Sequence, residues 1–66
     1  MTEFVFHTGR QQWGAILEWL ADYKVRVVTP KREKLTWDTE DLGPEVYSDQ
    51  YGISAIFPPG LLERDR

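Results

Sequence analysis

The absence of cysteine is the feature that most constrains how this 66-residue chain can fold. A chain this short buries only about 60 % of the surface that its unfolded form exposes. Without thiols, neither disulfides nor a thiolate zinc site can supplement so small a core. Large side chains must supply the buried area, and the chain has three Trp, three Tyr and three Phe. Because each aromatic side chain buries roughly 150–250 Å², we expect one globular domain with an aromatic core.

The composition favours a folded, cytoplasmic protein. With 41 % hydrophobic and 29 % charged residues, the chain is typical of globular rather than disordered sequences. Its apolar runs do not exceed three residues, so no transmembrane helix is predicted, and residues 1–3 do not resemble the start of a signal peptide. A secreted domain of this size would usually need disulfides or a metal. We expect a single domain over residues 1–60 and a charged tail over 61–66, a size typical of phage-encoded proteins.

The first third of the chain predicts a strand followed by a helix. Residues 3–7 are β-branched and aromatic, as strands require. Thr8 and Gln11 fit a capping box, and the apolar residues that follow recur with helical period, which predicts a helix over residues 9–22. The apolar stripe comprises Trp13, Ile16, Leu17, Leu20 and Ala21. Gly14 costs this helix roughly 1 kcal/mol relative to Ala, and its small size would allow close approach to a strand.

The remaining chain predicts strands. Residues 24–29 are rich in Val and are followed by Pro30, residues 34–38 would complete an antiparallel hairpin, and residues 51–57 alternate with period two. Residues 45–47 would add a short strand. We therefore expect an α+β fold, in which a single helix packs on one face of a small mixed sheet of three to five strands, in the order β-α-β-β-(β)-β. The helix would connect parallel strands by a right-handed crossover, and the other face of the sheet would be open.

Charge is distributed unevenly along the sequence, although the net charge is only −3. Basic residues concentrate between residues 10 and 34, whereas residues 38–49 contain five acids and no base. A one-sided distribution of this kind indicates surfaces that attract different partners.

The sequence offers little for catalysis. His7 is the single histidine, and neither Ser48 nor Ser54 lies in the Gly-x-Ser-x-Gly pattern of a nucleophile elbow. So short a chain also hardly encloses a substrate pocket, which commonly occupies about 300 Å³ or more. We therefore predict no catalytic residues, no enzymatic activity and no cofactor.

A calcium site in the acidic segment is also disfavoured. Asp38, Glu40, Gly43 and Asp49 imitate positions 1, 3, 6 and 12 of a calcium-binding loop, but Leu42 replaces the ligand at position 5. No helix is predicted on either side of the segment, so we predict no metal ligands.

The leading hypothesis is a non-catalytic protein-binding module that modulates or inhibits a larger macromolecule. Acidic residues would steer a partner with a basic surface, while exposed aromatics would hold it. The candidate acidic residues are Asp38, Glu40, Asp41, Glu45 and Asp49, and the candidate aromatic residues are Trp19, Tyr23 and Tyr47. On the predicted helix, Trp19 and Tyr23 would stack as an i, i+4 pair.

Two alternatives belong to other functional classes. A basic hairpin would bind the phosphates of a nucleic acid through Lys24, Arg26, Lys31, Arg32 and Lys34. Against this alternative, the whole chain is acidic, with an isoelectric point near 4.9. The second alternative is a homo-oligomeric structural or accessory protein that associates through an open sheet face or an edge strand. No membrane partner is expected.

Overall fold

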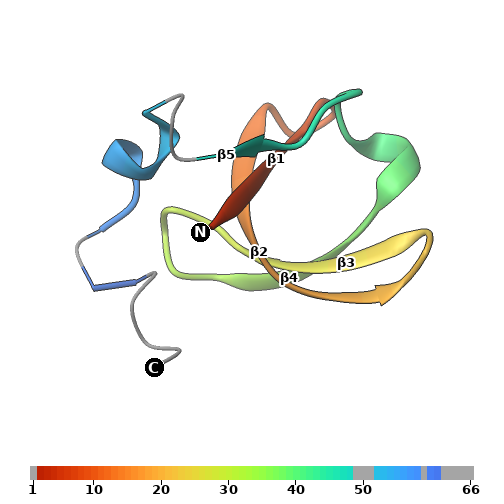
Figure 1. Ribbon diagram of the computed structural model, residues 1–66, viewed down its shortest axis with the longest axis horizontal. Helices are drawn as coiled ribbons and strands as arrows, with labels where there is room; N and C mark the ends of the chain where they lie inside the picture. The colour runs from red at the N-terminus through yellow and green to blue at the C-terminus, as the bar shows by residue number, and fades with distance from the viewer. Residues whose placement is uncertain (1, 49–51, 59, 62–66) are drawn as a thin grey trace.

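The computed structural model describes residues 2–48, 52–58 and 60–61. These residues fold around one antiparallel sheet of five strands, in the order β4-β3-β2-β1-β5 (Figure 1). The strands are β1 (Glu3–His7), β2 (Gln12–Ala21), β3 (Lys24–Val28), β4 (Lys34–Asp38) and β5 (Tyr47–Ser48). The 3-10 helices η1 (Thr39–Asp41) and η3 (Ile53–Ile56) follow β4 and β5. Strand β1 pairs with β2, β2 with β3 and β3 with β4, whereas β5 returns to pair with β1.

Strand β2 bends the sheet. Its beginning pairs with β1, and its remainder pairs with β3, so it belongs to both halves of the sheet. The register with β3 shifts between Ile16 and Glu18 and again between Trp19 and Ala21. Irregularities of this kind increase the local twist and bend the strand, and Figure 1 shows β2 curving from the side of β1 to the side of β3.

The segment after β4 brings the sheet back onto itself. Leu42 forms an isolated antiparallel bridge with His7 at the end of β1. Beside this bridge, the backbone N–H of Thr8 donates to the carbonyl oxygen of Asp41 at 3.0 Å, and that of Gly43 donates to the carbonyl of Phe6 at 2.9 Å. These contacts join the segment after the edge strand β4 to the end of β1, on the other side of β2.

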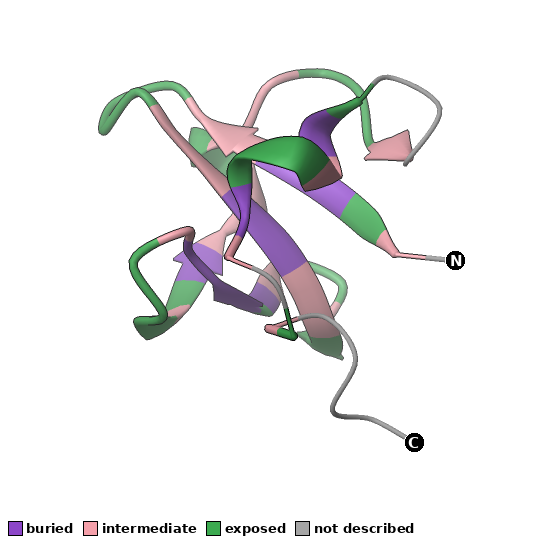
Figure 2. Cartoon of the chain, turned by 90° about the vertical axis from the view of Figure 1, so that its left-hand side faces the viewer, coloured by how far each residue is buried: buried purple, intermediate pink, exposed green. Residues whose placement is uncertain are grey.

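Apolar side chains cover both faces of the sheet, because neighbouring positions such as Phe4 and Val5 of β1 point to opposite sides. The inner cluster consists of Val5, Val25, Val27 and Trp37, with Ile16, Leu35 and Leu42 packed against it. The outer cluster consists of Phe4, Ala15, Val28, Ile53 and Phe57, with Trp13, Leu17, Tyr47 and Leu61 packed against it. Figure 2 shows the buried residues concentrated in the strands, while the connecting turns are mostly exposed.

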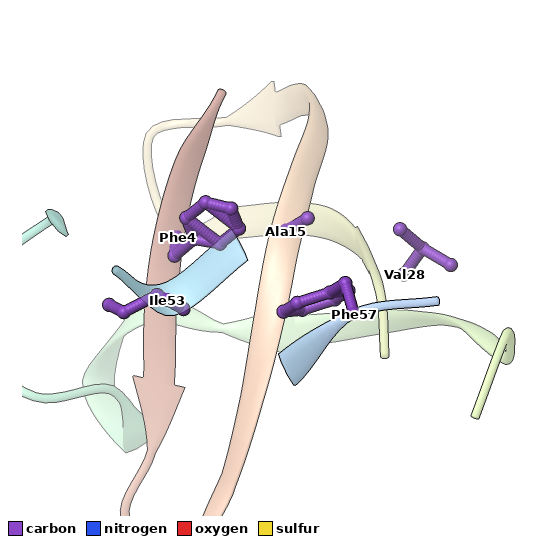
Figure 3. Close-up of a cluster of buried hydrophobic side chains, with 5 residues drawn as sticks. All are labelled: Phe4, Ala15, Val28, Ile53 and Phe57. Carbon is purple, nitrogen blue, oxygen red and sulfur yellow. The ribbon is translucent and has the colours of Figure 1, made fainter. Parts of the chain in front are cut away.

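The segment after β5 covers the outer face. Ile53 and Phe57 lie over β1 and β2, beside Phe4 and Ala15 (Figure 3). The rings of Phe4 and Phe57 are tilted, with centroids 5.2 Å apart. The expectation of an open sheet face was therefore wrong. Leu61, which the sequence assigns to the tail, also packs on this cluster.

The predicted helix over residues 9–22 is absent, so the α+β fold class was wrong. Residues 12–21 form a strand, and the structure is mostly β, with no α-helix in its described residues. The predicted capping residues build the turn between β1 and β2 instead. The Thr8 hydroxyl donates to the carbonyl of Asp41, and the Gln11 side-chain amide donates to the carbonyl of Thr8, both at 3.0 Å. The described residues contain no helix long and apolar enough to cross a membrane.

The other strand predictions were right in part. Strands at residues 3–7 and 34–38 are confirmed at both ends, and the predicted strand at 24–29 is one residue shorter. The hairpin of β3 and β4 is antiparallel, as expected, but the parallel crossover is wrong because all pairs are antiparallel. The predicted strand at 51–57 is also wrong. Within it, Gly52 has φ +75° and residues 53–56 form η3, with residue 51 outside the described part.

Candidate functional site

Exposed apolar side chains gather at the end of the hairpin formed by β2 and β3. Trp19 is 50 % exposed, Leu20 39 % and Tyr23 64 %. Trp19 lies opposite Val25, which in turn lies opposite Trp37. Trp19 thus extends the row of inner-cluster residues to the edge of the core, where half of its side chain remains in solvent. All three residues lie within five positions of the sequence, around the turn between β2 and β3.

A pocket of about 150 Å³ lies beside Tyr23. It is lined by Tyr23, Asp38, Thr39 and Glu40. Its shape follows from a backbone contact, since the N–H of Thr39 donates to the carbonyl of Tyr23 at 3.0 Å. This hydrogen bond holds η1 against the hairpin turn, so Asp38 and Glu40 line one pocket with the exposed tyrosine. We call Trp19, Leu20, Tyr23, Asp38, Thr39 and Glu40 the hairpin-end surface.

The two carboxylates of this surface differ in their partners. Asp38 accepts a hydrogen bond from the Lys24 ammonium at 2.9 Å, since the two residues are cross-strand partners in β3 and β4. This hydrogen bond, together with the charge of Asp38, raises the pKa of Lys24 above its usual 10.5. The ammonium also lies 5.8 Å from the centroid of the Tyr23 ring. Glu40 is exposed and forms no ion pair with any described residue, so its charge is available to a partner.

The rest of the predicted acidic set extends away from this pocket. Asp41 lies near the end of β1, where its carboxylate is 3.9 Å from Nε2 of His7. Glu45 is exposed in the connection to β5, and Asp49 lies outside the described residues. Only Asp38 and Glu40 of the predicted acidic residues therefore line the pocket with Tyr23.

The predicted aromatic set is also divided. Trp19 lies near the end of β2 and Tyr23 occupies the turn, so they are not the stacked helical pair that the sequence predicted. Tyr47, on β5, belongs to the other end of the sheet, where its ring meets the edge of Trp13 with centroids 5.2 Å apart. The sequence reasoning placed Leu20 in the core and did not consider Thr39. If residues 21–24 had been interpreted as a hairpin with Asp22 in its two-residue turn, Leu20 would have been placed near an exposed tip.

The predicted basic residues fall into two groups. Lys24 and Arg26 share one face of β3, and both have acidic neighbours: Asp38 at 2.9 Å from Lys24, and Glu18 at 3.8 Å from Arg26. The acidic and basic sets are therefore interleaved on this face, contrary to the expected separation. The other group, in and beside the β3–β4 turn, forms no ion pairs within the described part of the chain. It consists of Lys31, Arg32 and Lys34.

His7, the single histidine, lies at the end of β1. His7 packs its ring against Trp37, with centroids 4.9 Å apart, and its Nδ1 accepts from the backbone N–H of Arg10 at 3.1 Å. No group of three or more His, Asp or Glu side chains in the described ranges is placed to hold a metal ion. No protein-family model, curated protein or solved structure matches the chain.

Proposed function

We propose that this chain is a non-catalytic, cytoplasmic protein-binding module that modulates or inhibits a larger protein through its hairpin-end surface. The observation that carries the proposal is the exposure of Trp19, Leu20 and Tyr23 around the β2–β3 turn, where Tyr23 lines a pocket with two carboxylates. Aromatic side chains ringed by polar groups are the residues that contribute most to protein–protein affinity.

The dimensions of the pocket favour a protein partner. Sites for small molecules commonly occupy about 300–1,000 Å³, whereas this pocket measures about 150 Å³, which suits a single side chain. Its lining includes Tyr23 together with Asp38 and Glu40. An aromatic ring and carboxylates together stabilise a cation, so we propose that the pocket binds a Lys or Arg side chain of the partner.

The charged and the apolar residues of the same surface would contribute to binding in different ways. Glu40 would steer the basic partner and pair with its cation, an effect that salt weakens. Trp19 and Leu20, outside the pocket, would be desolvated around it and slow dissociation. Lys24 already neutralises Asp38, so we assign the larger electrostatic role to Glu40.

Affinity capture with matched variants tests the proposal. The variant Tyr23→Ser with Glu40→Gln removes the ring and the unpaired carboxylate, and the control, Ile56→Ser with Glu45→Gln, makes similar changes at exposed positions outside the surface. A partner captured by the wild-type chain should bind the control normally and bind the Tyr23/Glu40 variant at least about 30-fold more weakly, which corresponds to about 2 kcal/mol.

Thermal melting of both variants shows whether the fold is intact, and both should melt within a few degrees of the wild-type chain. The proposal is wrong if the purified partner binds the folded Tyr23/Glu40 variant as tightly as the wild type, or if the control loses binding equally.

A further inference from the structure

A second concave region lies between the turn that joins β1 to β2 and the turn that joins β3 to β4. This groove has a volume of about 390 Å³ and is lined by Arg10, Gln11, Gln12, Trp13, Pro30 and Lys31. Its size falls in the range of about 300–1,000 Å³ that accommodates a small molecule or one unit of a polymer. The lining residues come from two segments about 20 residues apart in sequence, so only the folded chain assembles the groove.

The groove and its border carry positive charge. Arg10 and Lys31 are exposed, and Arg32 and Lys34 continue the basic surface beyond the groove. Within residues 8–11 and 29–34 the single acid is Glu33. None of the four cations forms an ion pair within the described ranges, which leaves their charge available although the whole chain is acidic.

Hydrogen bonds fix the turn that presents Lys31. Thr29 is fully buried, and its backbone N–H donates to the carbonyl of Glu33 at 2.9 Å. The Thr29 hydroxyl accepts from the backbone N–H of Glu33 at 3.3 Å, and the Thr29 carbonyl accepts from that of Arg32 at 2.8 Å. Lys31 therefore projects from a closed turn, which limits the ordering that binding requires of the backbone.

The opposite turn is held in a similar way. The backbone N–H of Arg10 donates to Nδ1 of His7, and the side-chain amide of Gln11 donates to the carbonyl of Thr8. Gln11 has φ +53° and Arg32, in the facing turn, has φ +71°. Residues other than glycine rarely adopt this left-handed conformation, and such positions concentrate at ligand sites. Of these two residues, Gln11 lines the groove and Arg32 directly follows the lining residue Lys31.

Trp13 contributes an aromatic side chain to the lining of the groove. Its ring is held by edge contacts to Phe6 and Tyr47, with centroids 5.0 and 5.2 Å away. A fixed aromatic ring beside cations is the combination with which proteins bind single-stranded nucleic acids, because each base stacks while the phosphates pair with Lys and Arg. The amide of Gln12, also in the lining, can donate to or accept from a base edge.

We propose that this groove binds single-stranded nucleic acid, with one base against Trp13 and the flanking phosphates on Arg10 and Lys31. A base can reach the ring only when it is unpaired and unstacked, which favours a single strand over a duplex. The cations beyond the groove favour a polymer over a free nucleotide, since they would contact the next phosphates. This site shares no residue with the hairpin-end surface, so either proposal can fail alone.

Fluorescence anisotropy with labelled 15-nucleotide oligo(dT) and oligo(U) tests the assignment. At about 50 mM salt we expect dissociation constants below about 100 µM, and affinities that fall as salt rises. The double variant Arg10→Gln with Lys31→Gln should bind at least tenfold more weakly and reduce the salt slope by about 1.4, since each lost contact to a single strand accounts for about 0.7. Trp13→Leu should bind about tenfold more weakly with an unchanged slope.

The control is Lys24→Gln with Arg26→Gln, which removes the same charge from side chains that already have acidic neighbours. It should bind like the wild-type chain. Equal losses in the control and in the Arg10/Lys31 variant would overturn the assignment, as would an absence of binding below about 100 µM. Equally tight binding of duplex DNA, of free nucleotide or of polyglutamate would also overturn it, because the groove would then select neither a base nor a strand. The exposed positions of Arg10 and Lys31 keep this test independent of whether the Trp13 variant folds.

Discussion

Replacement of Gly14 by Ala should destabilise the protein strongly for one added methyl group. A Cβ at this position would lie 2.8 and 3.0 Å from two ring carbons of Trp37 and 2.9 Å from Cβ of Val27. Since ordinary contact begins near 3.4 Å, the ring or the strand must move by about 0.6 Å. Val27 Cβ is fixed to the backbone of β3, and Trp37 is buried in the same cluster, so neither neighbour can move freely.

The magnitude follows from two opposing effects. Overpacking of a well-filled core costs about 1–3 kcal/mol, while the loss of glycine's freedom in the unfolded chain returns about 0.4–1 kcal/mol. Because the clash involves two rigid neighbours, we expect a net loss of about 2 kcal/mol. Native domains have about 0.05–0.15 kcal/mol of stability per residue, so Gly14→Ala should remove a large part of the total.

Thermal and urea unfolding, followed by circular dichroism, measure this loss. A change of about 2 kcal/mol in so small a domain lowers the melting temperature by about 8–16 °C. Gly43→Ala is the matched control, since its Cβ would lie 3.9 Å from the nearest atom, the carbonyl oxygen of Phe6, and it should melt within a few degrees of the wild type. A Gly14→Ala protein as stable as this control would refute the packing argument.

A double-mutant cycle identifies the source of the strain. Trp37→Phe removes the outer ring carbons that meet the added methyl group, together with an indole N–H that has no hydrogen-bond partner among the described residues. In this background, Gly14→Ala should cost at least about 1 kcal/mol less than in the wild type, within the range of coupling between contacting residues. Additive effects would show that Trp37 is not the obstacle.

Two further predictions concern the outer cluster and the Lys24–Asp38 pair. In urea titrations, Phe57→Ala should lower the free energy of unfolding by about 3 kcal/mol, as expected for a buried ring. Ile56→Ala, at the adjacent and half-exposed position, should change it by no more than about 0.5 kcal/mol. Equal effects of the two substitutions would show that η3 does not cover the outer face. Asp38→Asn should lower the pKa of Lys24 toward its usual 10.5, which an NMR titration of the Lys24 Cε resonance measures. Because the pKa of Lys24 is raised in the folded chain, the contribution of the Lys24–Asp38 pair to stability is complete below about pH 10.5 and is lost as the pH rises through the higher folded pKa. An unchanged pKa of Lys24 in the Asp38→Asn variant would contradict the assignment of the shift to Asp38.

The strands that the sequence predicts correctly carry local signals. Residues 3–7, 24–28 and 34–38 combine β-branched or aromatic residues with nearby turn residues, so their neighbours in sequence are enough to identify them. Their pairing is also local in the hairpin of β3 and β4, where Pro30 and Lys31 form the turn. The ion pair between Lys24 and Asp38 across that hairpin depends on the register of β3 and β4, which the composition does not reveal.

The error at residues 9–22 has a specific cause. Trp13 and Leu17 pack in the outer cluster while Ile16 packs in the inner one, so β2 is apolar on both faces and shows no polar alternation. The two register shifts then displace the later residues. The apolar residues of this strand therefore recur at spacings of three and four, which is also the pattern of an amphipathic helix. The information that separates the two readings lies in the covering segment after β5, far away in sequence.

Residues 51–57 illustrate the converse problem. Ile53 and Phe57 are buried, but Ala55 between them is exposed. A spacing of four fits a strand with period two as well as a short helical turn, and Gly52 in the left-handed region decides for the turn. This segment packs on residues 25 to 53 positions earlier, from Val28 back to Phe4, a contact that no short window of the sequence contains.

The candidate site depends on the same long-range contacts. Tyr23 and Glu40 are 17 residues apart, and the hydrogen bond from Thr39 to Tyr23 brings them to one pocket. The sequence identified both residues as candidates because exposed aromatic and acidic residues attract partners, but it could not tell that Tyr47 and Glu45 lie elsewhere.

The completeness of the core is the strongest reason to regard the exposure of Trp19 and Tyr23 as functional. A chain of 66 residues needs most of its aromatic side chains inside, and a core with a gap would have recruited these two. The inner cluster is filled by Trp37, and the outer cluster is covered by Phe57, so neither face lacks an aromatic cover. The fold therefore does not force Trp19 and Tyr23 into the core, and their exposure supports the proposal that the hairpin end binds a partner.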